Sequence, residues 1–309
     1  MKYSVVLCTY NGEQYIEAQI ISIINQTHKV DELVICDDIS TDDTLRIVKT
    51  IMMKESIPYR IIVNSTRLGP SRNFLNGMKL ATGDYVFTCD QDDIWKKDKV
   101  EIFDNVVNTT KSMLYFSNGW VINEKREKIC ELWAAAGFDY SQREPILNTL
   151  IKQPKVTGAA MMVSRELIDL IKDIPLNTLH DYWFSLVASS NDSITAINRH
   201  TFYYRQHSNN VVGIKKMNAL GLIQMGVSNS KRQVDNRKTK EKQLEELLQL
   251  CSSNNRRVIA EALTFWHEMN ELNNLNYMKR IDVVLKNIKN KRYFQYSNGW
   301  LSAIRDIFV

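Results

Sequence analysis

Apolar and polar residues alternate along the first 100 positions with two different periods. Short apolar runs such as Tyr3–Cys8 are typical of strands that are buried on both faces. Between them, apolar residues recur every three or four positions, as Ile16, Ile20 and Ile23 do, which predicts helices. This order predicts βαβ crossovers and a mainly parallel sheet. The predicted strands are Tyr3–Cys8, Leu33–Cys36, Arg60–Val63 and Tyr85–Cys89, and the predicted helices are Glu13–Gln26, Ser40–Met53 and Ser71–Ala81.

The pattern becomes mixed after position 100 and helical after position 215. Apolar residues recur at helical spacing from Val258 to Leu275, so we expect an α/β domain over residues 1–213 and a basic helical region over residues 214–309. The polar run Ser228–Lys242 is the expected linker or exposed loop. Within the domain we predict strands at Ser112–Asn118, Trp120–Asn123, Gly158–Ser164 and Thr201–Arg205, and helices at Pro145–Ile151 and Arg165–Ile171.

Charge divides the chain more sharply than its net value of +5 indicates. Residues 213–309 hold 17 of the 40 basic and 9 of the 35 acidic residues, which leaves 23 against 26 for residues 1–212. With no accompanying nucleic-acid motif, this charge argues against a nucleic-acid partner. The basic pairs beside apolar helical stripes predict peripheral contact with the inner face of the cell membrane. The alternative is that these helices pack on the preceding domain or form a homodimer through the Val258–Leu275 stripe while their lysines face water.

The cysteines and the hydropathy pattern bear on the cellular location. The chain has 5 cysteines without CxxC spacing, mostly in apolar runs, which favours reduced, buried thiols over a disulfide framework or a zinc site. The sequence starts directly with a strand-like run, and no window approaches the roughly 18 consecutive apolar residues of a membrane span. We therefore expect a cytoplasmic protein.

Three of the predicted strands end in polar clusters. These clusters are Thr9–Gly12, Asp37-Asp38 and Asp90–Asp93, and ligands of parallel sheets bind beyond the carboxyl ends of strands. Turn formation would account for any one cluster but poorly for all three. The carboxylates of Asp90–Asp93 would repel one another without a cation, and oxygen ligands suit Mn²⁺ or Mg²⁺ together with a phosphate-bearing substrate. Neither GxxxxGK[ST] nor an early GxGxxG is present, so the usual ATP and NAD sites are absent.

Several segments resemble a known family of enzymes. The runs SVVLCTYNG, LVICDDISTDDT and LGPSRNFLNGMKLATGDYVFTCDQDDIW resemble the family-2 inverting glycosyltransferases of GT-A fold, with Asp90-Gln91-Asp92 as the DXD-type signature. VTGAAMMVSREL, LHDYWFSLVAS and YYRQHSNNVVG are similar to acceptor-side segments of its rhamnosyltransferase-like branch, which builds bacterial cell-surface polysaccharides. The resemblance covers residues 1–213 and implies a Rossmann-like, mainly parallel mixed sheet that is flanked by helices.

The resemblance also implies roles for individual residues. Asp38 would read the base of the nucleotide and Asp181 would be the catalytic base that inversion requires. The implied nucleotide-sugar site is Thr9, Tyr10, Asp38, Arg72 and Asp90, the metal site is Asp90, Asp92 and His207, and the acceptor site is Gly158, His180 and Trp183.

Each of these residues also has an ordinary structural explanation. Asp37 is better explained by a turn or a helix cap than by a ligand. Asp181 has the alternative of capping a helix that runs through Trp183. The alternatives for Arg72 and His207 are a solvated helix arginine and an exposed loop histidine.

These observations lead to one functional hypothesis with two rivals. We expect a metal-dependent inverting glycosyltransferase that moves a sugar, with rhamnose preferred, from a dTDP- or UDP-linked donor to a cell-surface polysaccharide or a lipid-linked glycan. A nucleotidyltransferase is one rival, but it would bring a glycine- and lysine-rich loop after the first strand, and Thr9–Gln14 has no lysine. A catalytically inactive glycan-binding scaffold is the other, and it should lack the complete set of metal and base residues.

Overall fold

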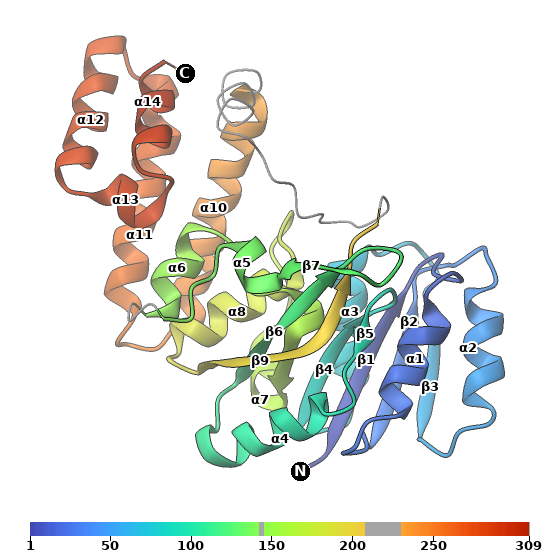
Figure 1. Ribbon diagram of the computed structural model, residues 1–309. Coiled ribbons are helices and arrows are strands. Elements are labelled where there is room, and N and C mark those ends of the chain that lie inside the picture. Colours follow the sequence, from blue (N-terminus) through green and yellow to red (C-terminus); the bar gives the residue numbers. More distant parts are fainter. Residues whose placement is uncertain (142–144, 208–229, 309) are drawn as a thin grey trace.

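A nine-stranded mixed sheet lies at the centre of the computed structural model, which describes residues 1–141, 145–207 and 230–308 (Figure 1). Eight strands follow the order β3-β2-β1-β4-β8-β6-β9-β5, and β7 pairs with β6. β8 is antiparallel to both of its neighbours, whereas β1–β4 are parallel to one another and β6 is parallel to β9. The strands are β1 (Tyr3–Thr9), β2 (Glu32–Asp37), β3 (Tyr59–Val63), β4 (Tyr85–Asp90), β5 (Ile94–Trp95), β6 (Leu114–Ile122), β7 (Lys128–Glu131), β8 (Met161–Ser164) and β9 (Ile194–Arg205).

Helices cover both faces of this sheet and explain why its strands read as continuous apolar runs. Val5 and Leu7 of β1 belong to one hydrophobic core, under α1, α2 and α4, and Val6 and Cys8 belong to a second core, under α3, α7 and α8. Both faces of β1 are therefore buried. The helices are α1 (Ile16–Ile24), α2 (Thr44–Met52), α3 (Pro70–Leu80), α4 (Lys99–Thr110), α5 (Leu132–Ala136), α6 (Ile146–Lys152), the short 3₁₀ turn η1 (Gly158–Ala160), α7 (Arg165–Leu170) and α8 (His180–Ser190).

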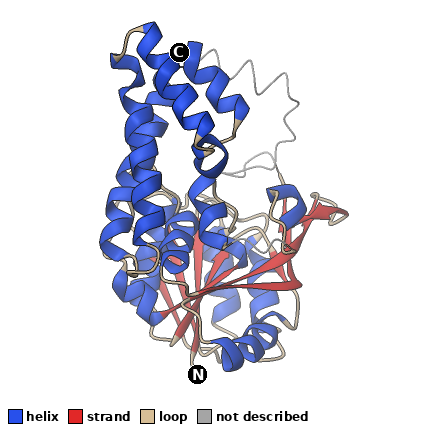
Figure 2. Ribbon diagram, turned by 90° about the vertical axis from the view of Figure 1, so that its left-hand side faces the viewer, coloured by secondary structure: helices blue, strands red, loops and turns tan. Residues whose placement is uncertain are grey.

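The carboxyl-terminal helices pack on the second core rather than standing apart from it. Leu244 and Leu247 of α10 are fully buried in the same cluster as Trp183 and Val187 of α8. None of the helices in the described ranges is long and apolar enough to cross a bilayer. These helices are α10 (Ser230–Leu250), α11 (Arg256–Glu271), the 3₁₀ turn η2 (Leu272–Asn274), α12 (Tyr277–Lys289), α13 (Arg292–Tyr296) and α14 (Trp300–Phe308), and they rise beyond the end of the sheet opposite the amino terminus (Figures 1 and 2).

The structure confirms the α/β order and corrects several local expectations. The strand expected at Gly158–Ser164 is shorter, because Gly158–Ala160 form η1 and only Met161–Ser164 form β8. Ser228–Lys242 is not a loop from Ser230 onward, because α10 begins there. The two strands expected around position 119 form the single strand β6, since Gly119 leaves room for the ring of Phe202. Helix α4 was not predicted. The expected boundary between residues 213 and 214 lies outside the described residues.

Candidate functional site

The polar clusters at the ends of β1, β2 and β4 lie side by side. Thr9 pairs with Asp37, and Cys8 pairs with Asp90 on the other side of β1. Because these strands are parallel, the residues that follow them share one edge of the sheet. The arrangement that the sequence predicts is therefore present.

The neighbouring carboxylates Asp37 and Asp38 both hold loops in place. Asp37 is buried and accepts hydrogen bonds from Thr9 Oγ1 at 2.7 Å and from the backbone N–H of Ser40 at 2.8 Å, which is the turn role that we favoured for it. Asp38 accepts hydrogen bonds from the backbone N–H groups of Leu68 at 2.7 Å and Gly69 at 2.9 Å. Its carboxylate thus anchors the segment before α3, and its reading of a nucleobase stays a prediction.

Tyr10 links this edge to the DXD-type segment and to a basic residue that the sequence did not single out. Its backbone N–H donates to Gln91 Oε1 at 2.9 Å, and Gln91 Nε2 donates back to the Tyr10 carbonyl at 3.0 Å. The guanidinium of Arg67 lies 3.8 Å from the centre of the Tyr10 ring. Arg72, the basic residue predicted for the donor, is exposed on α3 and makes no hydrogen bond or ion pair within the described chain.

Three aspartates lie at the end of β4 or directly after it, namely Asp90, Asp92 and Asp93. Burial raises the pKa of Asp90 to about 8, and the charges of Asp92 and Asp181 add to this rise. Asp93 is almost fully buried, and burial raises its pKa well above the usual value. Its Oδ1 accepts from the Arg205 backbone N–H at 3.0 Å, whereas its Oδ2 has no hydrogen-bond partner in the described structure. The site therefore concentrates buried carboxyl groups, and a bound cation would favour their charged form.

One buried cation lies behind these carboxylates. Lys99 of α4 donates to the Ala159 carbonyl at 2.7 Å, and its ammonium lies 4.2 Å from the centre of the Trp95 ring. Burial lowers the pKa of Lys99 to about 8, although Asp93 and Asp90 act in the opposite direction. Lys99 thus fixes η1 against the site, and it is a second basic residue that the sequence reasoning missed.

The donor set fits a divalent ion that arrives with phosphate. Within the described ranges, no three His, Cys, Asp or Glu side chains are arranged to hold a metal by themselves. Mg²⁺-type ions need only one or two carboxylates when phosphate oxygens complete their shell. Asp90 and Asp92 supply that pair, and the charge of Asp92 adds to the rise in the pKa of Asp90 that burial causes. His207 Nε2 lies 2.8 Å from Asp92 Oδ2, so the structure brings the third predicted ligand to this pair.

Asp181 lies in the first turn of α8 but does not cap it. The N-cap is Leu179, and no side chain caps the helix. Asp181 Oδ2 accepts from the Gly158 backbone N–H at 3.0 Å, and Oδ1 accepts from the Tyr182 backbone N–H at 2.7 Å. Its charge contributes to the raised pKa of Asp90, so the two carboxylates are close. This geometry suits a fixed base better than a helix cap.

Two of the residues predicted for the acceptor are in the core instead. The Trp183 ring is only 1% exposed, and an aromatic platform for a sugar needs an open face, so this expectation is wrong. The His180 ring is also buried and is stacked on Phe74, with ring centres 4.2 Å apart. Burial lowers the pKa of His180, and neither ring nitrogen has a hydrogen-bond partner in the described structure. The absent side chain of Gly158 makes room for this ring, since a Cβ there would lie 2.9 Å from His180 Nε2.

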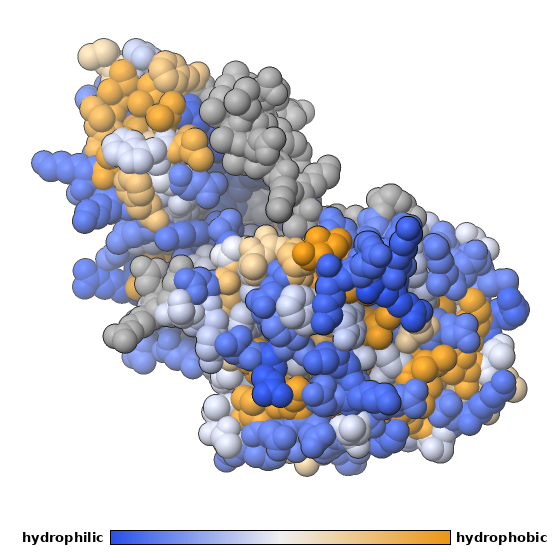
Figure 3. Space-filling model, in the orientation of Figure 1, coloured by the Kyte–Doolittle hydropathy of each residue, from blue (hydrophilic) through white to orange (hydrophobic). Residues whose placement is uncertain are grey.

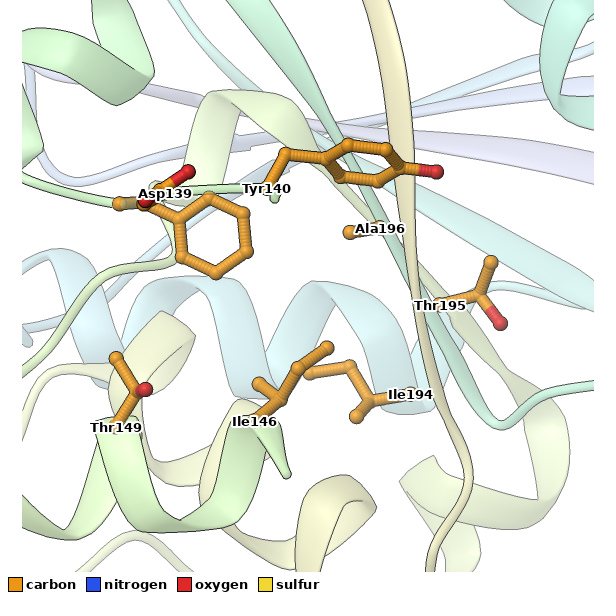
Figure 4. Close-up of a pocket in the computed structure, with 8 residues that line it drawn as sticks. Asp139, Tyr140, Ile146, Thr149, Ile194, Thr195 and Ala196 are labelled. Atoms are coloured by element: carbon orange, nitrogen blue, oxygen red, sulfur yellow. The ribbon is translucent and has the colours of Figure 1, made fainter. Parts of the chain in front are cut away.

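A pocket of about 370 Å³ lies elsewhere, at the amino end of β9. β9 is three strands from β4 in the sheet, and none of the predicted site residues lines this pocket. Tyr140 lies on one side of it, and Ile146 and Ile194 lie on the other (Figure 4). The remaining lining residues are Phe138, Asp139, Thr149, Thr195 and Ala196.

Comparisons with known proteins bear on this site. The family model described as "Glycosyl transferase family 2" matches residues 4–169. A dTDP-rhamnosyl transferase, RfbG of Shigella flexneri, is 28% identical over 237 residues, which are 70% of this chain and 78% of that protein. The UDP-Glc:alpha-D-GlcNAc-diphosphoundecaprenol beta-1,3-glucosyltransferase WfgD of Escherichia coli is 25% identical over 195 residues, 63% of this chain and 72% of that protein.

Solved structures share the fold at low sequence identity. S. aureus TarS 1-349 in complex with UDP-GlcNAc has a TM-score of 0.57 and 16% identity, with 87% of this chain and 88% of that chain covered. The mannosyltransferase PcManGT from Pyrobaculum calidifontis, in complex with GDP-Man and Mn²⁺, has a TM-score of 0.53 and 13% identity, with 99% and 85% covered. At these identities the likeness concerns the fold alone.

Proposed function

Because this chain belongs to glycosyl transferase family 2, we propose that its carboxylate edge transfers a sugar with inversion and with the help of a divalent metal ion. The chain is a glycosyltransferase of GT-A fold. The observation that carries the proposal is that Gly158 links Asp181 of α8 to β4: its backbone N–H donates to Asp181 Oδ2 at 3.0 Å, and its carbonyl accepts from Thr88 Oγ1 at 2.5 Å, two residues before Asp90. A base and a diphosphate site then face the same space, as a single displacement requires.

The chemistry assigned to Asp181 is general-base catalysis. In our proposal the acceptor hydroxyl oxygen attacks the anomeric carbon, its proton passes to the Asp181 carboxylate, and the bond from that carbon to the diphosphate oxygen breaks with its electron pair. The backbone N–H groups of Gly158 and Tyr182 hold the carboxylate in position. Asp90 and Asp92 would hold Mn²⁺ or Mg²⁺, which when bound offsets the charge of the diphosphate.

For the nucleotide-sugar site, we propose the same residues that the sequence predicts. Thr9, Tyr10, Asp38 and Arg72 would surround the nucleotide, and Arg67 joins them through its contact with the Tyr10 ring. We propose dTDP-rhamnose as the donor, and the similarity to a dTDP-rhamnosyl transferase supports this choice. A UDP-linked hexose is the competing donor, because glucosyltransferases are similar to the chain as well.

The acceptor in our proposal is a cell-surface polysaccharide or a lipid-linked glycan. A lipid-linked acceptor would place the chain peripherally at the inner face of the cell membrane, and a homodimer through the carboxyl-terminal helices is the competing proposal. Family membership argues against both a nucleotidyltransferase and an inactive glycan-binding scaffold.

A thermal-shift screen tests the donor and the metal together. The protein is heated with dTDP, UDP and GDP and with their sugar derivatives, each with and without Mn²⁺. We expect the largest rise in melting temperature with dTDP-rhamnose plus Mn²⁺, because a ligand that binds only the folded state stabilises it. An equal rise without the metal would contradict metal-assisted binding.

Two substitutions then separate donor binding from catalysis. Asp92→Ala should remove the Mn²⁺-dependent shift, whereas Asp181→Asn should keep that shift and lose transfer by roughly a hundredfold or more. Asp98→Asn is the matched control, since this neighbouring carboxylate makes no side-chain contact in the described structure and should behave as the wild type does. Wild-type transfer by Asp181→Asn would remove Asp181 as the base.

A further inference from the structure

Helix α14 presents four of its five large apolar residues outward, whereas the fifth, Ile307, packs partly buried against the core. Trp300, Leu301, Ile304 and Phe308 are 58%, 56%, 54% and 76% exposed. The residues that α14 buries are the small or polar Ser302, Ala303 and Asp306. A surface helix of a water-soluble protein normally does the reverse. We call the four exposed apolar residues the outer face of α14.

Polar contacts lock α14 in this orientation. Asp306 accepts from Arg237 Nη2 of α10 at 2.7 Å and from the Tyr293 hydroxyl at 3.1 Å, and all three groups are buried. Ser302 Oγ accepts from Ser297 Oγ at 2.8 Å. A rotation that buried Trp300 would break these bonds and leave the Arg237 charge unpaired in the interior, which is costly. The outer face of α14 is therefore a fixed surface.

The exposed apolar surface continues onto the neighbouring helix. The Phe294 ring of α13 lies edge-on to the Trp300 ring, with ring centres 5.6 Å apart, and it is partly exposed as well. Figure 3 shows apolar residues gathered on the carboxyl-terminal helices, at the upper left of the molecule. Soluble monomers rarely expose contiguous apolar patches without a partner.

The charge around this face selects the kind of partner. Residues 277–308 contain seven Lys or Arg and two Asp or Glu, and one of the two acids is Asp306, which is already paired inside. Lys289 and Lys291 are exposed, whereas the exposed Lys286 is paired with Glu268 of α11 at 3.3 Å. Two copies of such a face would bring like charges together, whereas an anionic lipid surface attracts each exposed cation and accepts apolar side chains. An exposed tryptophan is also typical of residues at the level of lipid headgroups.

We propose that the outer face of α14, with Phe294 and the nearby lysines, binds the surface of an anionic phospholipid bilayer. This inference adds a binding surface to the peripheral location proposed above. It rests on the proposed function only for the reason why the chain would need a membrane, not for the binding itself. Helix α11 begins beside Ser190, at the end of α8, and helices α11–α14 extend from there beyond the end of the sheet at which the parallel strands finish (Figures 1 and 2). A bilayer at α14 would therefore lie on the side of the molecule toward which the carboxylate edge opens.

Vesicle flotation tests the proposal without any need for turnover. Vesicles of phosphatidylcholine with one third phosphatidylglycerol should carry the wild-type chain at low ionic strength, and vesicles of pure phosphatidylcholine should carry much less. Binding should fall at about 1 M salt, where the Debye length is about 3 Å. A chain that stays unbound with anionic vesicles at low salt would overturn the proposal.

Variants assign the binding to this face. Trp300→Ser and Ile304→Ser should each weaken vesicle binding by about tenfold, because each removes an apolar side chain that the bilayer would bury. Leu176→Ser, which changes an apolar residue of similar exposure (66%) far from α14 in the sequence, is the matched control and should bind as the wild type does. Circular dichroism checks that each variant is folded. Equal binding by Trp300→Ser, Ile304→Ser and the wild type would contradict the assignment.

Light scattering distinguishes lipid from a second copy of the chain. We expect a monomer, and a dimer that Ile304→Ser dissociates would make a second copy the occupant of the face and overturn the proposal. The Asp181→Asn variant should bind vesicles as the wild type does. A failure of the transfer chemistry and a failure of membrane binding are therefore separate results.

Discussion

Gly158→Ala should displace the proposed catalytic base, Asp181, through the backbone of η1. Gly158 lies in η1, where its backbone N–H donates to Asp181 Oδ2 at 3.0 Å. A Cβ at this position would lie 2.9 Å from His180 Nε2, whereas ordinary contact begins at about 3.4 Å. The His180 ring cannot retreat freely, because it is buried and stacked on Phe74. The added methyl should therefore push η1 and α8 apart.

The size of the effect follows from this overlap of about half an ångström. Overpacking of this kind typically lowers the free energy of unfolding by about 1–3 kcal/mol. A catalytic group misplaced by 1 Å can lose about a hundredfold in rate, so we expect roughly a tenfold loss of turnover here. The donor-induced thermal shift should fall less than turnover does, because the hydrogen bond between Gly158 and β4 is made by Thr88 rather than by Asp90.

The assay measures nucleoside diphosphate release together with urea denaturation. Gly83→Ala is the matched control, since its Cβ would lie 2.7 Å from the Ser4 backbone nitrogen at the amino end of β1 and should destabilise the fold far from Asp181. A folded Gly158→Ala variant with wild-type turnover would refute the view that the hydrogen bond from η1 positions Asp181. Equal losses of turnover in both variants would refute it as well.

Two further predictions concern α10. Arg237→Met should lower the free energy of unfolding in urea by about 3 kcal/mol, because it removes the buried partner of the Asp306 carboxylate and leaves it only the partly exposed Arg305 as a cation, and Arg237→Met/Asp306→Leu should recover most of this loss. An equal loss in both variants would contradict this account. Burial lowers the pKa of Lys240 to about 7, so the unfolded chain binds more protons above pH 7 and wild-type stability should rise from pH 7 to about pH 10. Melting temperatures of Lys240→Met should lack this rise, and parallel pH profiles would exclude Lys240 as its source.

Local periodicity predicted the fold where each element buries a regular face. It failed for α10, whose buried stripe at Leu244 and Leu247 follows a long run of charged residues that resembles a loop. It also missed α4, although Val100, Phe103 and Val107 are spaced as a helix requires, because the preceding acidic segment draws attention to loop chemistry. The strand β5 has only two residues and therefore no period to detect.

The residues of the candidate site likewise include some that the sequence predicted and some that it did not. The position of the carboxylates was predictable because parallel strands bring their carboxyl ends to one edge of the sheet. For Asp90, its place directly after a predicted strand was enough to assign it to this edge. Trp183 was misplaced because nearly every residue of α8 is buried, so no exposed face distinguishes core residues from ligand-binding residues. Arg67 was missed because its contact with Tyr10 joins positions far apart in sequence, and a cation beside an aromatic ring leaves no local motif.

The contact between α10 and α8 limits where the chain can be truncated or joined to a relative in a chimeric enzyme. Gln243 Nε2 donates to Thr178 Oγ1 at 2.8 Å just before α8, and Asn191 Nδ2 donates to the Leu250 carbonyl at 2.9 Å just after it. Between them, the Lys240 ammonium donates to the Tyr182 hydroxyl, next to Asp181. A hybrid enzyme that takes its acceptor segment from a relative must therefore take α10 from the same parent. A cut placed before α10 would expose the back of the helix that carries Asp181.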